Sequence, residues 1–166
     1  MQFGLGCITL TLLLVSGLSK ITEREKHSLL TLHNQAREKA LLGKILGQPA
    51  ALRMPMMVWD DRLAQKAEIW SNKCTVGHDS KSDRADPRWS WVGQNFAAGG
   101  SVELGFNLWF NEHSSYNIST LKCNGVCGHY TQIIWADSTS LGCGVTDCPR
   151  STFLYGKSIV CNYGPG

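Results

Sequence analysis

The chain has 166 residues, a formal net charge of +3 and 17% charged residues. This length is enough for one domain with its own hydrophobic core. The basic residues are scattered along the chain, so the composition gives no support for nucleic-acid binding.

The first nineteen residues contain no charged side chain, and the stretch from Leu5 to Val15 is mostly apolar. Small residues follow at 16–19, so we expect a secretory signal peptide over 1–19 and a secreted, extracellular domain over 20–166. A buried helix or a membrane anchor is the alternative. We expect no membrane span, because the apolar run is shorter than the roughly 20 residues that a bilayer requires.

The first predicted helix begins at Thr22, which forms a capping box with Glu25. It ends near Gly43, a suitable C-terminal cap. His33 lies on this helix, and we expect it to be a hydrogen-bonded packing residue. Apolar residues recur at helical spacing at Leu29, Leu30, Leu32, Ala36, Ala40 and Leu41.

Two further helices are predicted after a loop over 44–57. Asp60 is the N-cap of the second, which ends at Cys74 and has an apolar face of Leu63, Ala64, Ala67 and Trp70. Ser101 caps the third, which ends near Glu112 and His113. Its predicted inward residues are Leu104, Leu108 and Trp109.

Three strands are predicted near the C-terminus. The segment 128–135 follows Cys127 and is expected to be a short buried strand with His129 at its mouth. Segments 141–145 and 153–163 are the other two, with a turn over 147–151. Helices flanking a small sheet predict an α+β fold, a three-layer α-β-α sandwich whose central sheet is mostly antiparallel.

Removal of the signal peptide removes Cys7 and leaves an even number of cysteines. An even count in a secreted chain predicts disulfides, although six cysteines allow fifteen pairings. A zinc cluster is the competing interpretation, but the paired Cys-x-x-Cys spacing is missing. The six are Cys74, Cys123, Cys127, Cys143, Cys148 and Cys161.

Two segments resemble the signatures of the CAP superfamily of cysteine-rich secretory proteins, venom antigens and plant pathogenesis-related proteins. They are Gly128-His-Tyr-Thr-Gln-Ile-Ile-Trp135 and Val160-Cys-Asn-Tyr-Gly-Pro165. The resemblance covers about residues 25–166, and venom-allergen-like proteins of parasitic worms are the most similar subgroup. It independently implies the α-β-α sandwich, and it implies a CAP domain that ends short at its C-terminus. The implied disulfides are Cys143–Cys161 and Cys74–Cys148, with Cys123–Cys127 by remainder.

The resemblance also implies a cleft built from two histidines and two acidic residues. The matching positions are His78, Gln94, Glu112 and His129. Gln94 stands where many members have glutamate, so one candidate general base is missing. A neutral amide can still orient an imidazole ring. His78 and His129 could hold a divalent cation such as Zn²⁺, or both could be structural.

Aromatic residues gather at the end of the third predicted helix, at Trp109, Phe110 and Tyr116. They belong either to the core or to the sterol or lipid site that the resemblance implies. Asn117 begins an N-glycosylation sequon.

The leading hypothesis is a secreted, non-enzymatic protein that binds sterols or other lipids and requires no cofactor. The sequence contains neither a His-Glu-x-x-His helix nor a Gly-x-Ser-x-Gly elbow. One alternative is a hydrolase that uses His129, His78 and Glu112, with Ser138 or a metal. The other is a disulfide-stiffened ligand for an extracellular partner protein.

Overall fold

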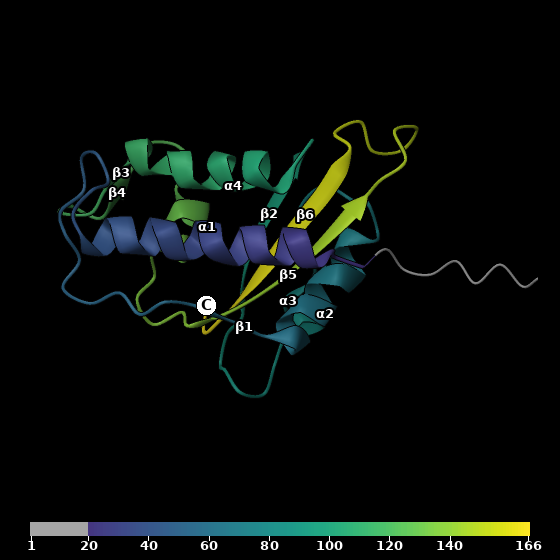
Figure 1. The fold of residues 1–166 in the computed structure, drawn as a ribbon, viewed down its shortest axis with the longest axis horizontal. Coiled ribbons are helices and arrows are strands. Elements are labelled where there is room, and N and C mark those ends of the chain that lie inside the picture. Colours follow the sequence, from purple (N-terminus) through teal and green to yellow (C-terminus); the bar gives the residue numbers. More distant parts are fainter. Residues whose placement is uncertain (1–19) are drawn as a thin grey trace, which may run out of the picture.

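The structure is a computed structural model that describes residues 20–166, so the expected signal peptide and Cys7 lie outside the described part of the chain. Figure 1 shows how the elements are arranged. They are α1 (Glu23–Leu41), β1 (Val58–Trp59), α2 (Asp61–Ser71), α3 (Lys81–Arg84), β2 (Gly93–Gly99), α4 (Val102–Phe110), the 3₁₀ helix η1 (Asn111–Ser115), β3 (Tyr116–Asn117), β4 (Lys122–Cys123), α5 (Gly128–Ile133), β5 (Ser140–Asp147) and β6 (Lys157–Gly164).

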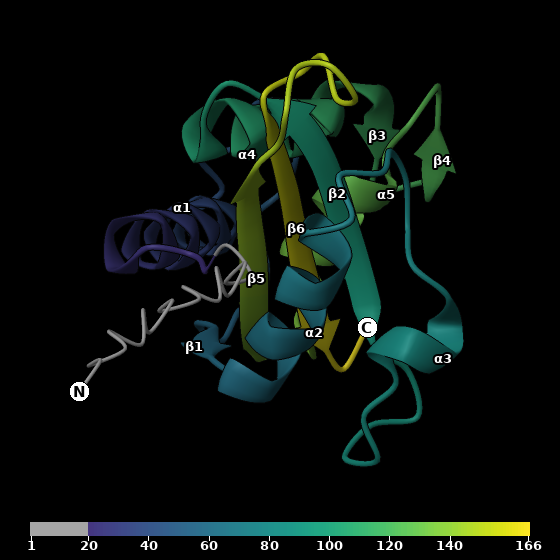
Figure 2. The ribbon, with the colours of Figure 1, turned by 90° about the vertical axis from the view of Figure 1, so that its right-hand side faces the viewer.

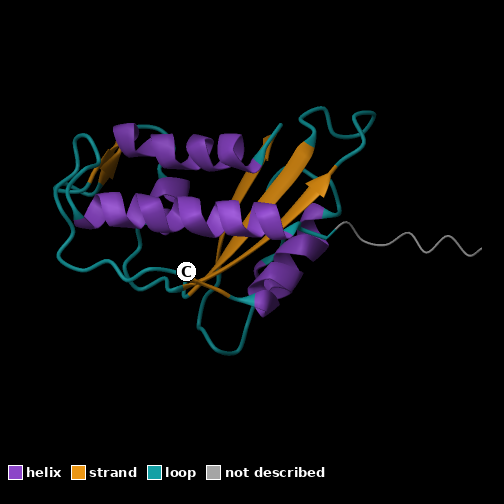
Figure 3. Cartoon of the chain, viewed as in Figure 1, coloured by secondary structure: helices purple, strands orange, loops and turns teal. Residues whose placement is uncertain are grey.

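A four-stranded sheet with the order β1-β5-β6-β2 forms the middle layer. Only β1 pairs in parallel, with β5, and the other pairings are antiparallel. Helix α2 covers one face, while α1, α4 and α5 lie on the other side of the sheet (Figures 2 and 3). The prediction of an α-β-α sandwich with a mostly antiparallel sheet is confirmed.

The alternation of residues along β5 explains how the two helical layers fit. Gly142 and Gly144 face α2, and a Cβ atom on either would lie within 2.3 Å of the α2 backbone. These glycines therefore allow helix and sheet to approach closely. The residues that alternate with them, Leu141, Cys143 and Val145, are buried in the core on the opposite face.

The predicted helix starts are confirmed by their caps. Thr22 and Glu25 form the reciprocal capping box of α1, and Asp60 accepts from the N–H groups of Arg62 and Leu63 at the start of α2. Ser101 accepts from Leu104 N at the start of α4. Capping residues satisfy N–H groups that have no partner inside the helix, so they mark helix starts from sequence alone.

The predicted strand over 128–135 is wrong, because residues 128–133 form helix α5. Tyr130 and Ile133 are three residues apart and are both buried, which is the spacing of one face of a helix. The segment is too short for its hydrophobic pattern to distinguish this spacing from the alternating pattern of a strand. Tertiary contacts decide the outcome. Glu112 accepts from the first N–H groups of α5, and Arg37 donates to the carbonyl groups of Ile133 and Trp135 at its end.

The inward face of α4 is only partly the predicted one, because Trp109 is buried as expected and the two leucines are not. Leu104 and Leu108 are about half exposed, whereas Phe106 and Trp109 are buried. Gly105 explains the choice, since a Cβ there would lie 2.7 Å from Ile159 of β6. Strand β2, which pairs with β6 along its whole length, is absent from the predicted elements, as are α3 and the two-residue strands β1, β3 and β4. Boundaries differ as well: α2 ends at Ser71, before Cys74, and β6 starts at Lys157 rather than at 153.

The three disulfides that the family resemblance implies are present. Cys143 and Cys161 are direct partners across β5 and β6, and Cys74–Cys148 joins the end of α2 to the end of β5. Cys123–Cys127 closes a ring between β4 and α5. Loop-closure entropy predicts contributions of about 4 kcal/mol for Cys74–Cys148, about 3 for Cys143–Cys161 and about 2 for Cys123–Cys127.

Within residues 20–166, no helix has both the length and the apolar character that crossing a membrane requires.

Candidate functional site

One half of the cleft joins η1 to α5 through Glu112 and His129. The Glu112 carboxylate accepts from the backbone N–H groups of His129 and Tyr130 and contacts His129 Nδ1 at 2.5 Å. A carboxylate only accepts at neutral pH, so Nδ1 carries the ring proton. In the neutral ring this leaves the lone pair on Nε2. The side chains are 13% exposed for Glu112 and 25% for His129.

The other half is a directed chain of amides that ends at His78. Asn162 on β6 donates through Nδ2 to the Leu63 carbonyl of α2, at 3.2 Å. Its Oδ1 accepts from Gln94 Nε2 at 3.0 Å, so Gln94 Oε1 is the free acceptor. That oxygen lies 2.9 Å from His78 Nδ1 and also accepts from Asp79 N. His78 is therefore fixed in the same tautomer as His129, with its Nε2 lone pair available.

The four predicted cleft residues thus come together from four separate segments. The rings of His78 and His129 have centroids 6.4 Å apart and an interplanar angle of 27°. Trp109 stacks behind His129 at 6.2 Å. Among residues 20–166, no group of three or more histidine, cysteine or acidic side chains is placed to hold a metal ion.

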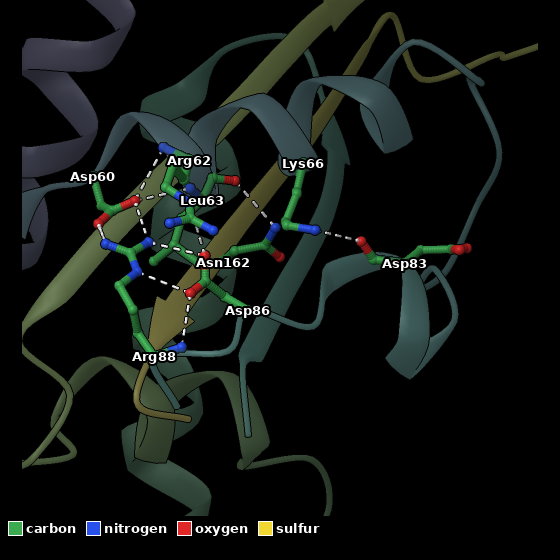
Figure 4. A network of polar contacts seen from close by, with 8 residues as sticks. All are labelled: Asp60, Arg62, Leu63, Lys66, Asp83, Asp86, Arg88 and Asn162. Carbon is green, nitrogen blue, oxygen red and sulfur yellow. Dashed lines mark hydrogen bonds and ion pairs between the residues drawn. The ribbon is translucent and has the colours of Figure 1, made fainter. Parts of the chain in front are cut away.

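An ion-pair network fixes the loop over 78–92, which carries His78, against α2 (Figure 4). Arg88 pairs with Asp60, the N-cap of α2, and with Asp86, whose side chain is fully buried. Arg62 also pairs with Asp86. The hydrogen bonds from Arg88 lower the pKa of Asp86 to about 2, although burial opposes this shift. In the same figure, Lys66 donates to the Asp83 carbonyl at the other end of the loop.

A buried polar chain supports the backbone of His129 from behind. Asn95 of β2 donates to the His129 carbonyl at 3.1 Å, and its side chain also interacts electrostatically with Tyr163. The Tyr163 hydroxyl donates to His33 Nε2 at 2.8 Å, while His33 Nδ1 donates to the Leu29 carbonyl. Burial lowers the pKa of His33 to about 4, so the ring is neutral. His33 is thus a hydrogen-bonded core residue, as expected.

Of the remaining predicted residues, Trp109 is buried directly beside His129, and the others lie outside the cleft. Trp109 is 1% exposed and donates through its indole N–H to the Phe96 carbonyl. Phe110 is half-buried and packs against two groups of buried apolar residues, one that includes Trp109 and one that includes Tyr130. Tyr116 lines a separate hollow of about 500 Å³ beside β3 and β4, and the exposed Asn117 lies on its rim. Ser138 is fully buried and donates to the Pro165 carbonyl.

Three residues that support the cleft are absent from the sequence-based prediction. Arg37, Asn95 and Asn162 are all buried, and each serves a backbone or amide group near the histidines. Asn162 lies inside the C-terminal signature, which is the one signal that could have drawn attention to it. Arg37 and Asn95 are isolated polar residues in a helix and a strand, and nothing local distinguishes them.

Comparison with known proteins places this geometry in context. A family model described as "Cysteine-rich secretory protein family" matches residues 30–163. Venom allergen 5 of Rhynchium brunneum is 40% identical over 162 residues, covering 87% of this chain and 69% of the relative. GLIPR1-like protein 1 of Bos taurus is 37% identical over 143 residues, covering 82% of this chain and 56% of the relative. The chain therefore spans about half the length of some curated relatives.

Solved structures give the same grouping. The Schistosoma mansoni venom allergen-like protein 4 superposes with a TM-score of 0.80 and 29% identity, covering 88% of this chain and 90% of that one. The structure of NaASP2 with Zn²⁺ has a TM-score of 0.74 and 25% identity, with coverages of 88% and 82%.

Proposed function

This chain belongs to the cysteine-rich secretory protein family, and on that premise we propose that it is a secreted, non-enzymatic binding module whose two-histidine cleft holds a divalent cation such as Zn²⁺. The observation that supports this most is the shared tautomer of His78 and His129. Each ring donates through Nδ1 to an oxygen, so each presents an Nε2 lone pair. A histidine that binds zinc through one nitrogen commonly donates through the other in this way.

The site supplies two protein ligands, and this determines its expected properties. The Glu112 oxygens are engaged by His129 and by two backbone N–H groups, so Glu112 orients a ligand rather than serving as one. Water or a side chain of a bound partner would fill the remaining positions of a tetrahedral ion. We therefore expect weaker binding than at a closed structural site. The similar structure of NaASP2 with Zn²⁺ supports the choice of metal.

Calorimetry with Zn²⁺ tests this proposal. Binding at pH 7.5 should be lost in a His78→Ala/His129→Ala variant and kept in His27→Ala, since His27 is exposed on α1 outside the cleft. Binding should also weaken at pH 5.5, because a protonated imidazole has no lone pair for a metal. The proposal is wrong if the wild type binds no Zn²⁺ at pH 7.5. It is also wrong if the double variant binds Zn²⁺ as tightly as the wild type does.

The arrangement of the cleft supports a binding role over hydrolysis. The serine that a hydrolase could recruit, Ser138, is buried and bonded to Gln132 and Pro165. Gln94 provides an amide where a second carboxylate would be needed, and an amide does not accept a proton at neutral pH. Turnover of an ester or peptide substrate that His129→Ala abolishes, with the fold intact, would favour the hydrolase instead.

Lipid binding is a second candidate function, and a groove along α1 favours it. The groove has a volume of about 530 Å³, and its lining combines Leu30, Leu41, Leu42 and Met56 with five polar residues, among them Glu38, while more apolar than polar surface faces the groove. A mainly apolar cavity of this size suits a lipid chain or a sterol. The groove lies apart from Trp109, which is buried in the core. Phe110→Ala should therefore act mainly on stability.

Lipids that copurify with the secreted protein should be identified by mass spectrometry and then titrated. Leu42→Glu should weaken binding, because it places a charge in the groove. Leu108→Glu is the matched control, as Leu108 is similarly exposed on α4 but outside the groove. Equal affinities of the two variants would rule out this groove. If Phe110→Ala lost affinity without losing stability, the aromatic cluster would be the lipid site.

A further inference from the structure

We propose that Cys123–Cys127 is a thiol-exchange site, at which Cys123 accepts a small anionic thiol such as glutathione. The other two disulfides do not share its surroundings. Cys143 and Cys161 are both 0% exposed, and in the Cys74–Cys148 bridge Cys148 is 7% exposed and Cys74 is half-buried. Cys123 is exposed on the two-residue strand β4, while its partner Cys127 is 5% exposed. An approaching thiol can therefore reach one sulfur of this bond.

Ring size favours the same bond. Cys123 and Cys127 are separated by four positions, compared with 18 and 74 for the other two bridges. Opening a short ring releases little chain entropy, so the rest of the fold loses little when this bond breaks. The segment is anchored weakly as well, because β3 and β4 pair over two residues each.

Charge around Cys123 suits an anionic attacker. Residues 114–127 contain no aspartate or glutamate, and the exposed Lys122 immediately precedes Cys123. The attacking species in disulfide exchange is a thiolate, so a neighbouring cation assists its approach. Leu121, next to Lys122, has a φ of 55° and is 73% exposed. A non-glycine residue with this backbone conformation is uncommon and is found at functional turns more often than elsewhere.

The exchange proceeds in two steps. A glutathione thiolate attacks Sγ of Cys123, the Cys123–Cys127 bond breaks, and a mixed disulfide forms at Cys123. The electron pair leaves on Cys127 Sγ, which takes a proton from water. A second glutathione thiolate then attacks the glutathione sulfur, forming oxidised glutathione and releasing the Cys123 thiol. Tyr116 and Cys123 both line the hollow beside β3 and β4. Attachment of glutathione to Cys123 would therefore change the lining of this hollow.

The test uses the folded, oxidised domain in a glutathione buffer, with acid quenching, alkylation and peptide mapping by mass spectrometry. We expect glutathione on Cys123, the alkylating label on Cys127, and the other four cysteines still paired. Glutathione on Cys127, earlier opening of either other bridge, or no reaction until the protein unfolds would overturn the proposal.

Two pairs of variants test separately the roles of the charge at Lys122 and of the exposure of Cys123. Lys122→Glu should slow the reaction roughly thirtyfold, since reversing a nearby charge in water replaces an attraction of about 1 kcal/mol with a repulsion of the same size. Lys81→Glu, an exposed lysine on α3, should leave the rate unchanged. In folded protein the free Cys123 of Cys127→Ser should be alkylated faster than the free Cys127 of Cys123→Ser. Equal alkylation rates would show that exposure does not direct the attack.

Discussion

The two histidines of the cleft are held in the same tautomer by different means. His129 is held by the charged Glu112, which also binds two backbone N–H groups at the start of α5. His78 is held by the neutral Gln94, whose orientation is set by Asn162 and ultimately by a carbonyl of α2. A carboxylate fixes the ring proton by itself, whereas an amide does so only when its other end is also fixed.

The comparison shows what the glutamine at position 94 changes and what it preserves. The geometry needed to orient His78 is kept, and the negative charge that would raise the basicity of the ring is lost. The His129 half should therefore contribute more to folding and to cation affinity than the His78 half. Four measurements test this difference, from the largest expected effect to the smallest.

The largest effect concerns the buried support behind His129. Since the pKa of His33 is about 4 in the folded protein and about 6.5 in an unfolded chain, the unfolded state binds more protons between these values. The contribution of His33 to stability is complete above pH 6.5 and decreases by about 3 kcal/mol as the pH falls to 4. Urea denaturation across this range should show a shallower decrease for His33→Gln. Parallel curves would mean that His33 does not remain neutral.

Removing the two oxygen acceptors should separate the halves by stability. Glu112→Ala leaves two backbone N–H groups and His129 Nδ1 without their acceptor, so we expect a loss of about 2–3 kcal/mol. Gln94→Ala removes neutral hydrogen bonds at a more exposed position and should cost about 1 kcal/mol. Chemical denaturation at pH 7.5 compares them. The asymmetry is absent if the two losses are equal.

A carboxylate at position 94 should make the His78 half of the cleft more similar to the His129 half in cation affinity. Gln94→Glu should raise Zn²⁺ affinity about tenfold, because a carboxylate behind a ligating histidine increases its basicity. The same change should lower stability, because Asn162 presents its acceptor Oδ1 to position 94 and a flipped amide would lose its bond to the Leu63 carbonyl. Calorimetry and denaturation of one sample measure both. Unchanged affinity with lower stability would show that only orientation matters.

The smallest expected effect is that of His78 on folding. His78 is exposed, so His78→Ala should change the unfolding free energy by less than about 0.5 kcal/mol. Its melting temperature in metal-free buffer should match that of the wild type. This result would make His78→Ala a clean probe of cation binding, while a clear destabilisation would show that His78 also holds its loop.

Much of this architecture could be predicted from local signals. The caps at Thr22, Asp60 and Ser101 fix three helix starts because they satisfy N–H groups within the same turn. The two signature segments identified the family, and with it the disulfides and the four cleft residues. The hydrophobic pattern failed where it was short or shifted, at α5 and on α4, because partners distant in the chain decide which side faces the core.

The sequence by itself therefore determined the helix starts, the sandwich and the identity of the cleft residues, since these depend on local chemistry and on family motifs. Only the tertiary structure decided that residues 128–133 form a helix, because Glu112 and Arg37 satisfy its two ends. It also decided the tautomers of His78 and His129. A ring proton is placed by the oxygen that faces it, and here those oxygens come from residues 16 and 17 positions away.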